Sequence, residues 1–223
     1  MNVNFSYSFD IGKTVPIYIK HKLSLLTENH PKISELEYLI EILPPLGEDG
    51  PWIAGGALLR TKLGLPMTTD IDLFFKNYPQ LEDYKSKLKL NYEGKKFSYV
   101  KEELRKNAVN IVINYKERTF IIQLIHRQFY DGPCKLLDEF DLNICQLAYD
   151  GKYLFVAEGT IQSIENKFIN INEVFNAPHT MARCMKYAKL GFNMPNSEIG
   201  KFFSKISNEV KNEVKKEVED YAE

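Results

Sequence analysis

The chain has 223 residues, of which 44% are hydrophobic and 26% charged, a composition typical of an ordinary globular protein. Its formal net charge of −1 gives no global electrostatic case for nucleic-acid binding. No apolar run approaches the roughly 20 residues of a membrane span, and the N-terminus lacks the pattern of a signal peptide. Three cysteines without a CxxC pair argue against a disulfide framework, so we expect a cytoplasmic protein with no membrane partner.

The first 50 residues predict an extended arm and then a helix. Alternating apolar residues over 1–20 are typical of one or two short strands. The stretch 34–43 has apolar residues at helical spacing, and Ser34 and Glu37 form a capping box at its start. Two prolines end this helix, and 47–51 reads as a turn.

A glycine pair follows the next apolar run. Residues 52–54 (WIA) predict a short strand that ends at Gly55 and Gly56, and 57–63 (ALLRTKL) predicts a helix. Two glycines between a strand and a helix let the backbone approach a ligand closely. The helix N-terminus favours an anion, so this turn suits a phosphate.

An acid pair comes a few residues later. The stretch 69–75 predicts a strand in which Asp70 and Asp72 are separated by one residue. Their side chains are expected on the same face, about 6.6 Å apart along the chain at ~3.3 Å per residue. Such carboxylates suit one or two Mg²⁺ or Mn²⁺ ions. A phosphate cradle beside a cation site indicates a protein that handles nucleotides.

The middle of the chain predicts a helix and two hairpins. A helical pattern covers 77–90, a strand is expected at 96–100, and 102–107 reads as a loop or short helical turn. The β-branched runs 108–114 and 118–125 predict a hairpin joined by 115–117. A second hairpin is expected from 140–149 and 152–156 around Asp150-Gly151, although part of its first run also fits a helix.

From Thr160 onward the chain predicts helices. The stretch 177–190 ends at Gly191, a suitable C-cap. Residues 197–221 repeat apolar side chains in steps of three and four, so this amphipathic helix needs a partner surface. That surface is either the rest of the chain or, in the other interpretation, a second copy in a homo-oligomer.

Three segments together resemble a known family. GGALLR at 55–60, followed by DIDLFF at 70–75, is similar to the signature of the DNA polymerase β-like nucleotidyltransferase superfamily. FDLNICQLAYDG at 140–151 and NAPHTMARCMKYAKLGF at 176–192 resemble later motifs of its CCA-adding enzyme and bacterial poly(A) polymerase group.

The resemblance implies an α+β nucleotidyltransferase fold, with a mixed β-sheet flanked by helices and a small C-terminal helical part. Its catalytic domain would cover 1–158, and 159–223 would form the helical part packing on it. The implied reaction transfers a nucleoside monophosphate from an NTP, ATP or CTP first, to a hydroxyl acceptor. The family-level acceptor is the 3′ end of RNA or tRNA.

The resemblance also assigns residues to roles. Asp70, Asp72 and Asp141 would be catalytic, and the first two would bind the metal. The nucleotide-binding candidates are Gly55, Gly56, Arg60, Lys62, Arg183 and Lys186. There are two departures: Phe140 replaces an arginine of the family pattern, and Gln123 stands where the family has a third carboxylate. His126 is a weaker candidate for contacting the acceptor, and a strand-end residue is its simpler interpretation.

Three functions remain open on this sequence. The first is an active, metal-dependent nucleotidyltransferase. The second is a catalytically weak or inactive member of the fold that binds nucleotide, nucleic acid or a partner protein, as Gln123 and Phe140 suggest. The third is an interaction module that docks a partner through its C-terminal helix.

Overall fold

The computed structural model divides the chain into two compact units. The first unit comprises 1–139 and 145–158, and the second comprises 140–144 and 159–223. The structure describes residues 17–27, 35–68, 70–90 and 97–207. The predicted arm at 1–16, the predicted cap Ser34 and the last predicted helical residues, 208–221, lie outside this part.

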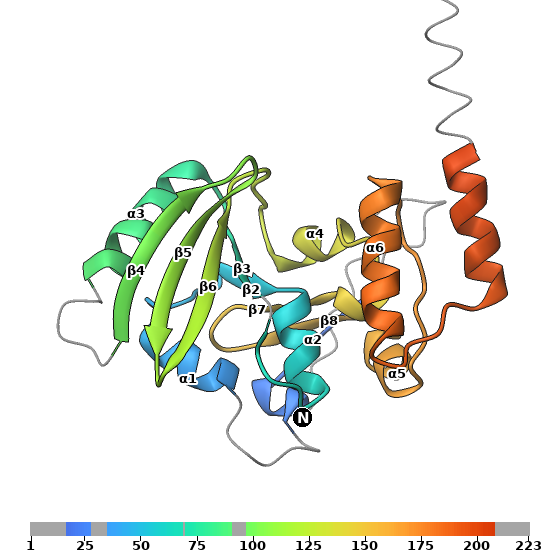
Figure 1. The fold of residues 1–223 in the computed structure, drawn as a ribbon, viewed down its shortest axis with the longest axis horizontal. Helices are drawn as coiled ribbons and strands as arrows, with labels where there is room; N and C mark the ends of the chain where they lie inside the picture. The colour runs from blue at the N-terminus through green and yellow to red at the C-terminus, as the bar shows by residue number, and fades with distance from the viewer. Residues whose placement is uncertain (1–16, 28–34, 69, 91–96, 208–223) are drawn as a thin grey trace, which may run out of the picture. The chain divides into compact units, whose positions relative to one another are not determined.

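The first unit is built on an eight-stranded mixed sheet with the order β1-β8-β7-β2-β3-β6-β5-β4 (Figure 1). The strands are β1 (Tyr18–His21), β2 (Trp52–Ala54), β3 (Ile71–Phe74), β4 (Phe97–Leu104), β5 (Ala108–Tyr115), β6 (Arg118–Ile125), β7 (Leu147–Tyr149) and β8 (Leu154–Ala157). Pairing is antiparallel along this order except between β3 and β6, which are parallel. The predicted mixed sheet is thus confirmed.

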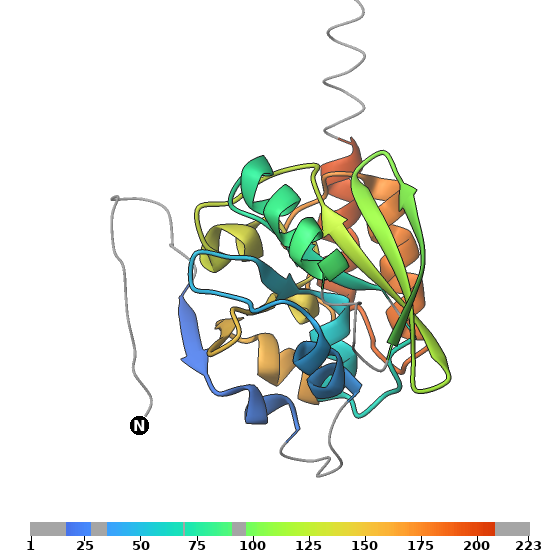
Figure 2. The same cartoon turned by 90° about the vertical axis from the view of Figure 1, so that its left-hand side faces the viewer.

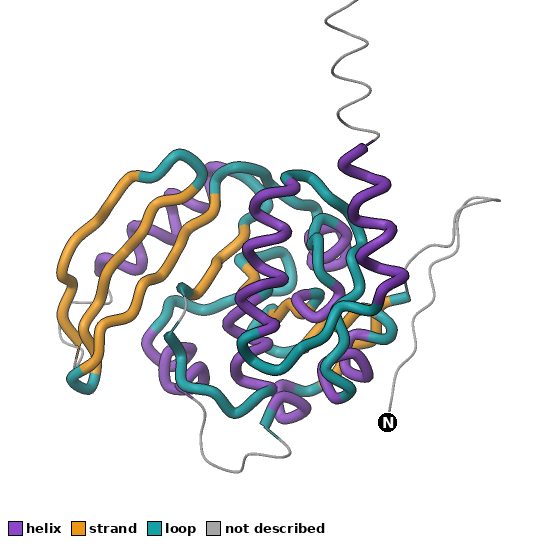
Figure 3. The backbone as a smooth tube through the Cα atoms, turned by 45° about the vertical axis from the view of Figure 1, so that its right-hand side comes forward, coloured by secondary structure: helices purple, strands orange, loops and turns teal. Residues whose placement is uncertain are grey.

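The long strands β4, β5 and β6 form an antiparallel meander that stands out beside the shorter strands (Figure 3). The predicted hairpin of β5 and β6 is confirmed, and its turn is shorter than expected. Lys116 and Glu117 alone connect the strands, with φ angles of 48° and 62°. Two successive residues at positive φ match the right-handed twist of a hairpin.

Within the residues that the structure describes, the first unit contains four α-helices and a 3₁₀ helix. They are η1 (Leu23–Leu26), α1 (Glu35–Ile42), α2 (Gly56–Lys62), α3 (Tyr78–Leu90) and α4 (Pro133–Asp138). The predicted helices at 34–43, 57–63 and 77–90 correspond to α1, α2 and α3. Helix α3 buries Leu81, Tyr84 and Leu88 and runs along one face of the meander (Figures 1 and 2).

The prediction of a loop or short helical turn at 102–107 was wrong for 102–104, because β4 continues to Leu104, and correct for 105–107, which form the loop before β5. Glu102 is tolerated in this edge strand since α3 supplies two cations that pair with it. The Glu102 carboxylate lies 2.5 Å from Lys85 Nζ and 3.1 Å from Lys89 Nζ. Tertiary ion pairs therefore override the polar local pattern.

The second predicted hairpin forms, but its first strand begins later than expected. Strands β7 and β8 flank Asp150 and Gly151, and Asp150 Oδ1 accepts hydrogen bonds from Lys152 N and Tyr153 N at 2.8 and 2.6 Å. Gly151 has a φ of +94°, which glycine adopts without strain. Before β7, the chain forms the 3₁₀ helix η2 (Asn143–Cys145), which matches the helical alternative for this run.

The second unit is mainly helical, with α5 (Thr160–Glu165), α6 (Ala177–Ala188) and a helix over 196–207. Residues 166–176, expected to be helical, are not, and two isolated bridges, Leu142–Ile171 and Phe168–Asn193, tie this unit together. Its buried apolar side chains include Ile164, Ile169, Ile171, Val174, Tyr187, Phe192 and Phe202.

None of the helices in the described part of the chain has both the length and the apolar character needed to cross a bilayer.

Candidate functional site

The glycine pair forms a fixed turn between β2 and α2. Gly55 has φ 78° and ψ −131°, a conformation that an L side chain rarely adopts. Its N–H donates to Leu147 O of β7 at 2.9 Å, and its carbonyl accepts from Leu59 N at 3.2 Å. The turn is therefore held by the sheet on one side and by the helix on the other.

The acid pair lies beside this turn. Asp72 is the register partner of Ala54, the residue directly before Gly55. On β3, Ile71 and Leu73 are fully buried while Asp72 is half-buried, so the acid is on the more open face of the sheet. Asp70 directly precedes β3 and is also half-buried. The two acids and the two glycines are thus neighbours within the first unit.

Gln123 completes this group from β6. In the parallel pairing of β3 and β6 it is the register partner of Asp72, and its Nε2 donates to Asp70 Oδ2 at 2.7 Å. This is the strand on which the family pattern has its third carboxylate. The resulting donor set of two carboxylates and one amide carbonyl is made of oxygen ligands, which suit Mg²⁺ or Mn²⁺.

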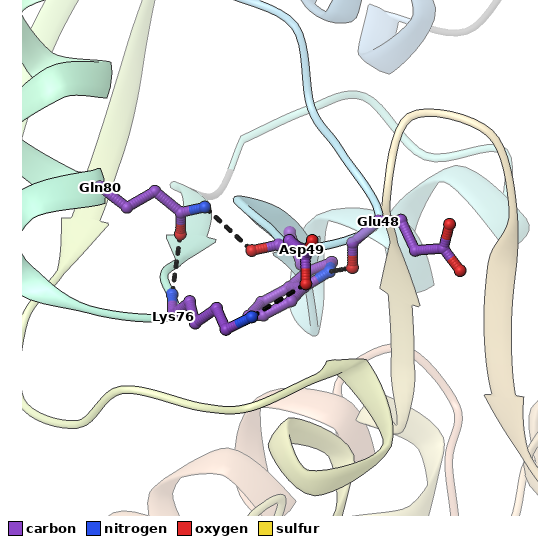
Figure 4. Close-up of polar contacts among 5 residues, drawn as sticks. Glu48, Asp49, Lys76 and Gln80 are labelled. Carbon is purple, nitrogen blue, oxygen red and sulfur yellow. Dashed lines mark hydrogen bonds and ion pairs between the residues drawn. The ribbon is translucent and has the colours of Figure 1, made fainter.

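A polar network ties the chain before β2 to the chain after β3, at one end of this antiparallel pair (Figure 4). Lys76, just after β3, donates its N–H to Gln80 Oε1 at 2.8 Å, and Gln80 Nε2 donates to Asp49 O at 2.9 Å. Lys76 Nζ also lies 2.9 Å from Asp49 Oδ1. Trp52 Nε1 donates to Glu48 O at 3.3 Å. The turn before β2 is therefore tied to the turn after β3.

The two cations of α2 make backbone contacts. Arg60 Nε donates to Pro66 O at 2.7 Å, and Lys62 Nζ donates to Leu25 O at 3.0 Å. Lys62 is only 7% exposed. These contacts give both side chains a role in fixing loops, and their contact with phosphate stays a prediction.

In the second unit, Asp141 and Arg183 come together. Asp141 is 2% exposed, its Oδ2 accepts from Thr180 Oγ1 at 2.8 Å, and its Oδ1 lies 3.3 Å from Arg183 Nη1. Arg183 is half exposed, so the buried carboxylate holds a guanidinium that reaches solvent. Lys186 is exposed one turn further along α6. Burial, and then the charge of Asp141, raises the pKa of the neighbouring Cys184 to about 11.

Two further polar groups lie on or next to the β5–β6 hairpin. His126 Nε2 and Asn110 Oδ1 are buried, and neither has a hydrogen-bond partner in the described part of the chain. His126 was a candidate from the sequence. Asn110 was missed, because it lies inside the apolar run AVNIVIN and reads there as one more strand residue.

Among the described residues, no group of three or more His, Cys, Asp or Glu side chains is arranged to hold a metal. Asp70 and Asp72 supply two carboxylates, and the side chain next to them, Gln123, is an amide. Any cation site here therefore depends on Asp70, Asp72 and neutral oxygens.

The fold is similar to solved structures of CCA-adding enzymes. The Thermotoga maritima CCA-adding enzyme complexed with tRNA matches with 18% identity and a TM-score of 0.54, over 79% of this chain and 43% of the enzyme. A CCA-adding enzyme in complex with CTP matches with 16% identity and a TM-score of 0.58, over 85% and 47% of the two chains. A complex with ATP gives 15% identity and 0.54, over 79% and 42%.

The chain therefore spans less than half the length of these enzymes, and at such identities the likeness concerns the fold. It confirms the α+β nucleotidyltransferase fold expected from the sequence. No curated protein sequence matches the chain significantly. A family profile described as Gabija anti-defense 2 family protein matches residues 26–167, which is more than half of the chain. The chain thus belongs to the Gabija anti-defense 2 family, and it has the fold of the CCA-adding nucleotidyltransferases.

Proposed function

We propose that this chain is a metal-dependent nucleotidyltransferase that moves a nucleoside monophosphate from an NTP to a hydroxyl acceptor. The observation that carries the proposal is that Asp70 and Asp72 lie next to the Gly55–Gly56 turn. ATP and CTP are the first nucleotides to test, and the 3′ end of RNA is the first acceptor, because solved relatives of this fold were captured with tRNA, CTP and ATP.

In the proposed reaction, the oxygen of the acceptor hydroxyl forms a bond to the α-phosphorus of the NTP. The bond from that phosphorus to the β-phosphate oxygen breaks, pyrophosphate leaves, and the hydroxyl proton passes to water. Asp70 and Asp72 would bind a divalent cation, which supplies positive charge against the charge that develops on the phosphates. Gln123 would hold Asp70 in place through its 2.7 Å hydrogen bond.

The glycine turn would receive the triphosphate. The N–H of Gly55 already donates to Leu147 O, so the amides that follow it, in the first turn of α2, are the candidates for phosphate contact. First-turn amides of a helix have no acceptor within the helix. Neither glycine carries a side chain that would keep a phosphate away from them.

The second unit carries two of the nucleotide-binding candidates. Arg183 and Lys186 are exposed cations there, and their contact with a nucleotide stays a prediction. Asp141 is almost fully buried, so we propose that it acts by holding Arg183 rather than by touching the substrate. This replaces the direct catalytic role expected for Asp141 from the sequence by an indirect one.

The test is nucleotidyl transfer by the full chain, with each α-labelled NTP, Mg²⁺ and either total RNA or cell lysate as acceptor. The double variant Asp70→Asn/Asp72→Asn should lose at least about a hundredfold in rate, since each carboxylate supports charge in the transition state. Asp83→Asn is the matched control, because Asp83 is an exposed acid on α3 paired only with Lys87 among the ion pairs described. Equal rates for the wild type and the double variant would refute the proposal.

The second candidate is a binding module of this fold without turnover. Gln123 favours it, because an amide at the third position leaves the site with two negative charges. The family is described as anti-defense against Gabija, and we propose that this chain has such a role and that the site serves it. Cells that carry Gabija separate the candidates: if the double variant keeps the anti-defense effect of the wild type, binding rather than transfer is the function.

A further inference from the structure

A strip of polar side chains crosses the sheet from the acid pair. Asn110 on β5 pairs with Gln123 on β6, Gln123 pairs with Asp72 on β3, and Asp72 pairs with Ala54 on β2. Residues directly opposite each other on neighbouring strands have their side chains on the same face. The strip therefore extends from the glycine turn through one carboxylate to two carboxamides.

Asn110 is the unusual member of this strip. It is 7% exposed, and its Oδ1 is buried without a hydrogen-bond partner in the described part of the chain. Its neighbours on β5, Val109 and Ile111, are buried apolar residues on the opposite face. A buried acceptor without a donor is costly to a fold, so its presence in a native strand calls for a ligand group that donates to it.

The spacing of the strands limits which ligand group can donate to Asn110 Oδ1. Two strand separations, about 9–10 Å, lie between the backbones of Asn110 and Asp72. This is too far for Asn110 to share a cation directly with Asp72, so its contact with that cation would have to pass through a water molecule bound to the ion. Mg²⁺ and similar ions keep several of their waters when they bind proteins.

We propose that Asn110 is a positioning residue for the hydrated cation of the acid pair, with its Oδ1 accepting a hydrogen bond from a cation-bound water. The proposal rests on the proposed function, because it takes Asp70 and Asp72 as the cation ligands. Since both amides of the strip are neutral, the site has less negative charge than one with three carboxylates. The cation therefore binds weakly by itself and more tightly together with the phosphates of a nucleotide.

The experiment is a Mn²⁺ titration of the full chain without nucleotide, with free Mn²⁺ followed by electron paramagnetic resonance. Asn110→Asp adds one negative charge within about 8 Å of the ion and should tighten Mn²⁺ binding about fivefold or more. Asn114→Asp is the matched control: it lies on the same strand and face, about 13 Å further along, and is exposed. At that distance its charge is screened, and the affinity should change less than twofold.

A second variant tests the same role of Asn110 if a buried aspartate at this position prevents folding. Asn110→Leu has a similar volume and removes the acceptor, so it should leave the protein folded and at least as stable. Its Mn²⁺ affinity should fall about threefold, which a purely structural role for Asn110 would not produce. A repeat titration with ATP present should show tighter Mn²⁺ binding in the wild type.

The outcomes separate this inference from the proposed function. If Asp70→Asn/Asp72→Asn abolishes Mn²⁺ binding while Asn110→Asp behaves like Asn114→Asp, or Asn110→Leu binds like the wild type, the role of Asn110 is wrong and the acid-pair site stands. If the double variant binds Mn²⁺ as tightly as the wild type, the cation site itself is refuted, and the inference is refuted with it.

Discussion

Gln80 connects the two strands that carry the candidate site, and its removal gives a direct test of that architecture. Its side chain accepts from Lys76 N at 2.8 Å and donates to Asp49 O at 2.9 Å. Each such bond contributes about 0.5–1.5 kcal/mol net, and the lower half of that range applies because both contacts are exposed. Gln80→Ala should therefore destabilise the protein by about 1–2 kcal/mol, or roughly 3–6 °C in Tm for a chain of this size.

The assay is thermal unfolding followed by fluorescence of Trp52, the single tryptophan, which is fully buried in β2. Its signal reports the first unit selectively. Ser86→Ala on the same helix is the control, since Ser86 Oγ bonds only within α3, to Glu82 O at 2.9 Å, and should change stability little. If Gln80→Ala shifts the Tm no more than this control, the two hydrogen bonds of the Gln80 side chain do not stabilise the β2–β3 pair.

Three further predictions concern stability and reactivity. Gly50 has a φ of +88° and a Cβ there would lie 2.9 Å from Gln80 Oε1, so Gly50→Ala should cost about 1–3 kcal/mol in urea unfolding. The hydrogen bond from Lys85 lowers the pKa of Glu102, so this stabilisation is full above about pH 4.5 and is lost as the pH falls through the lowered pKa. Glu102→Gln should then destabilise the protein by less than about 1 kcal/mol at pH 7 after screening, and this difference should shrink as the pH falls through the lowered pKa. Burial raises the pKa of Cys184 to about 11, so its reaction with a thiol reagent should be slow at pH 8 and accelerate about tenfold per pH unit; fast modification at pH 8 would contradict this.

Local patterns in the sequence predicted most elements of the first unit. The alternating and β-branched runs gave β5 and β6, the helical spacings gave α1 and α3, and Asp150-Gly151 gave the second hairpin. The error at 102–104 has a tertiary cause, because lysines of α3 pair with Glu102 in this edge strand. The helical prediction for 166–176 failed for a similar reason: backbone bridges to distant residues hold this segment.

The pairing of Asn110 with Gln123 could have been predicted from the sequence. It follows from the two-residue turn at Lys116 and Glu117, because counting back equally along both strands brings these side chains opposite each other. A loop of 115–117 was expected instead, and one extra loop residue shifts the register. The parallel pairing of Asp72 with Gln123 has no such local signal, since no turn joins β3 to β6.

The neutral side chain of Gln123 also determines how strongly a divalent cation stabilises the protein. Gln123→Glu would replace the hydrogen bond to Asp70 by a repulsion between carboxylates, so without a cation this variant should be less stable than the wild type. A divalent ion between three carboxylates would offset that repulsion, and a ligand that binds the folded state stabilises it by RT ln(1 + c/Kd), where c is the free ligand concentration, which is larger for tighter binding. The Tm of Gln123→Glu should therefore rise more with added Mn²⁺ than the Tm of the wild type or of Asn114→Asp. An equal response of all three proteins would show that Gln123 is remote from the cation, and that the acids and the amide do not act as one site.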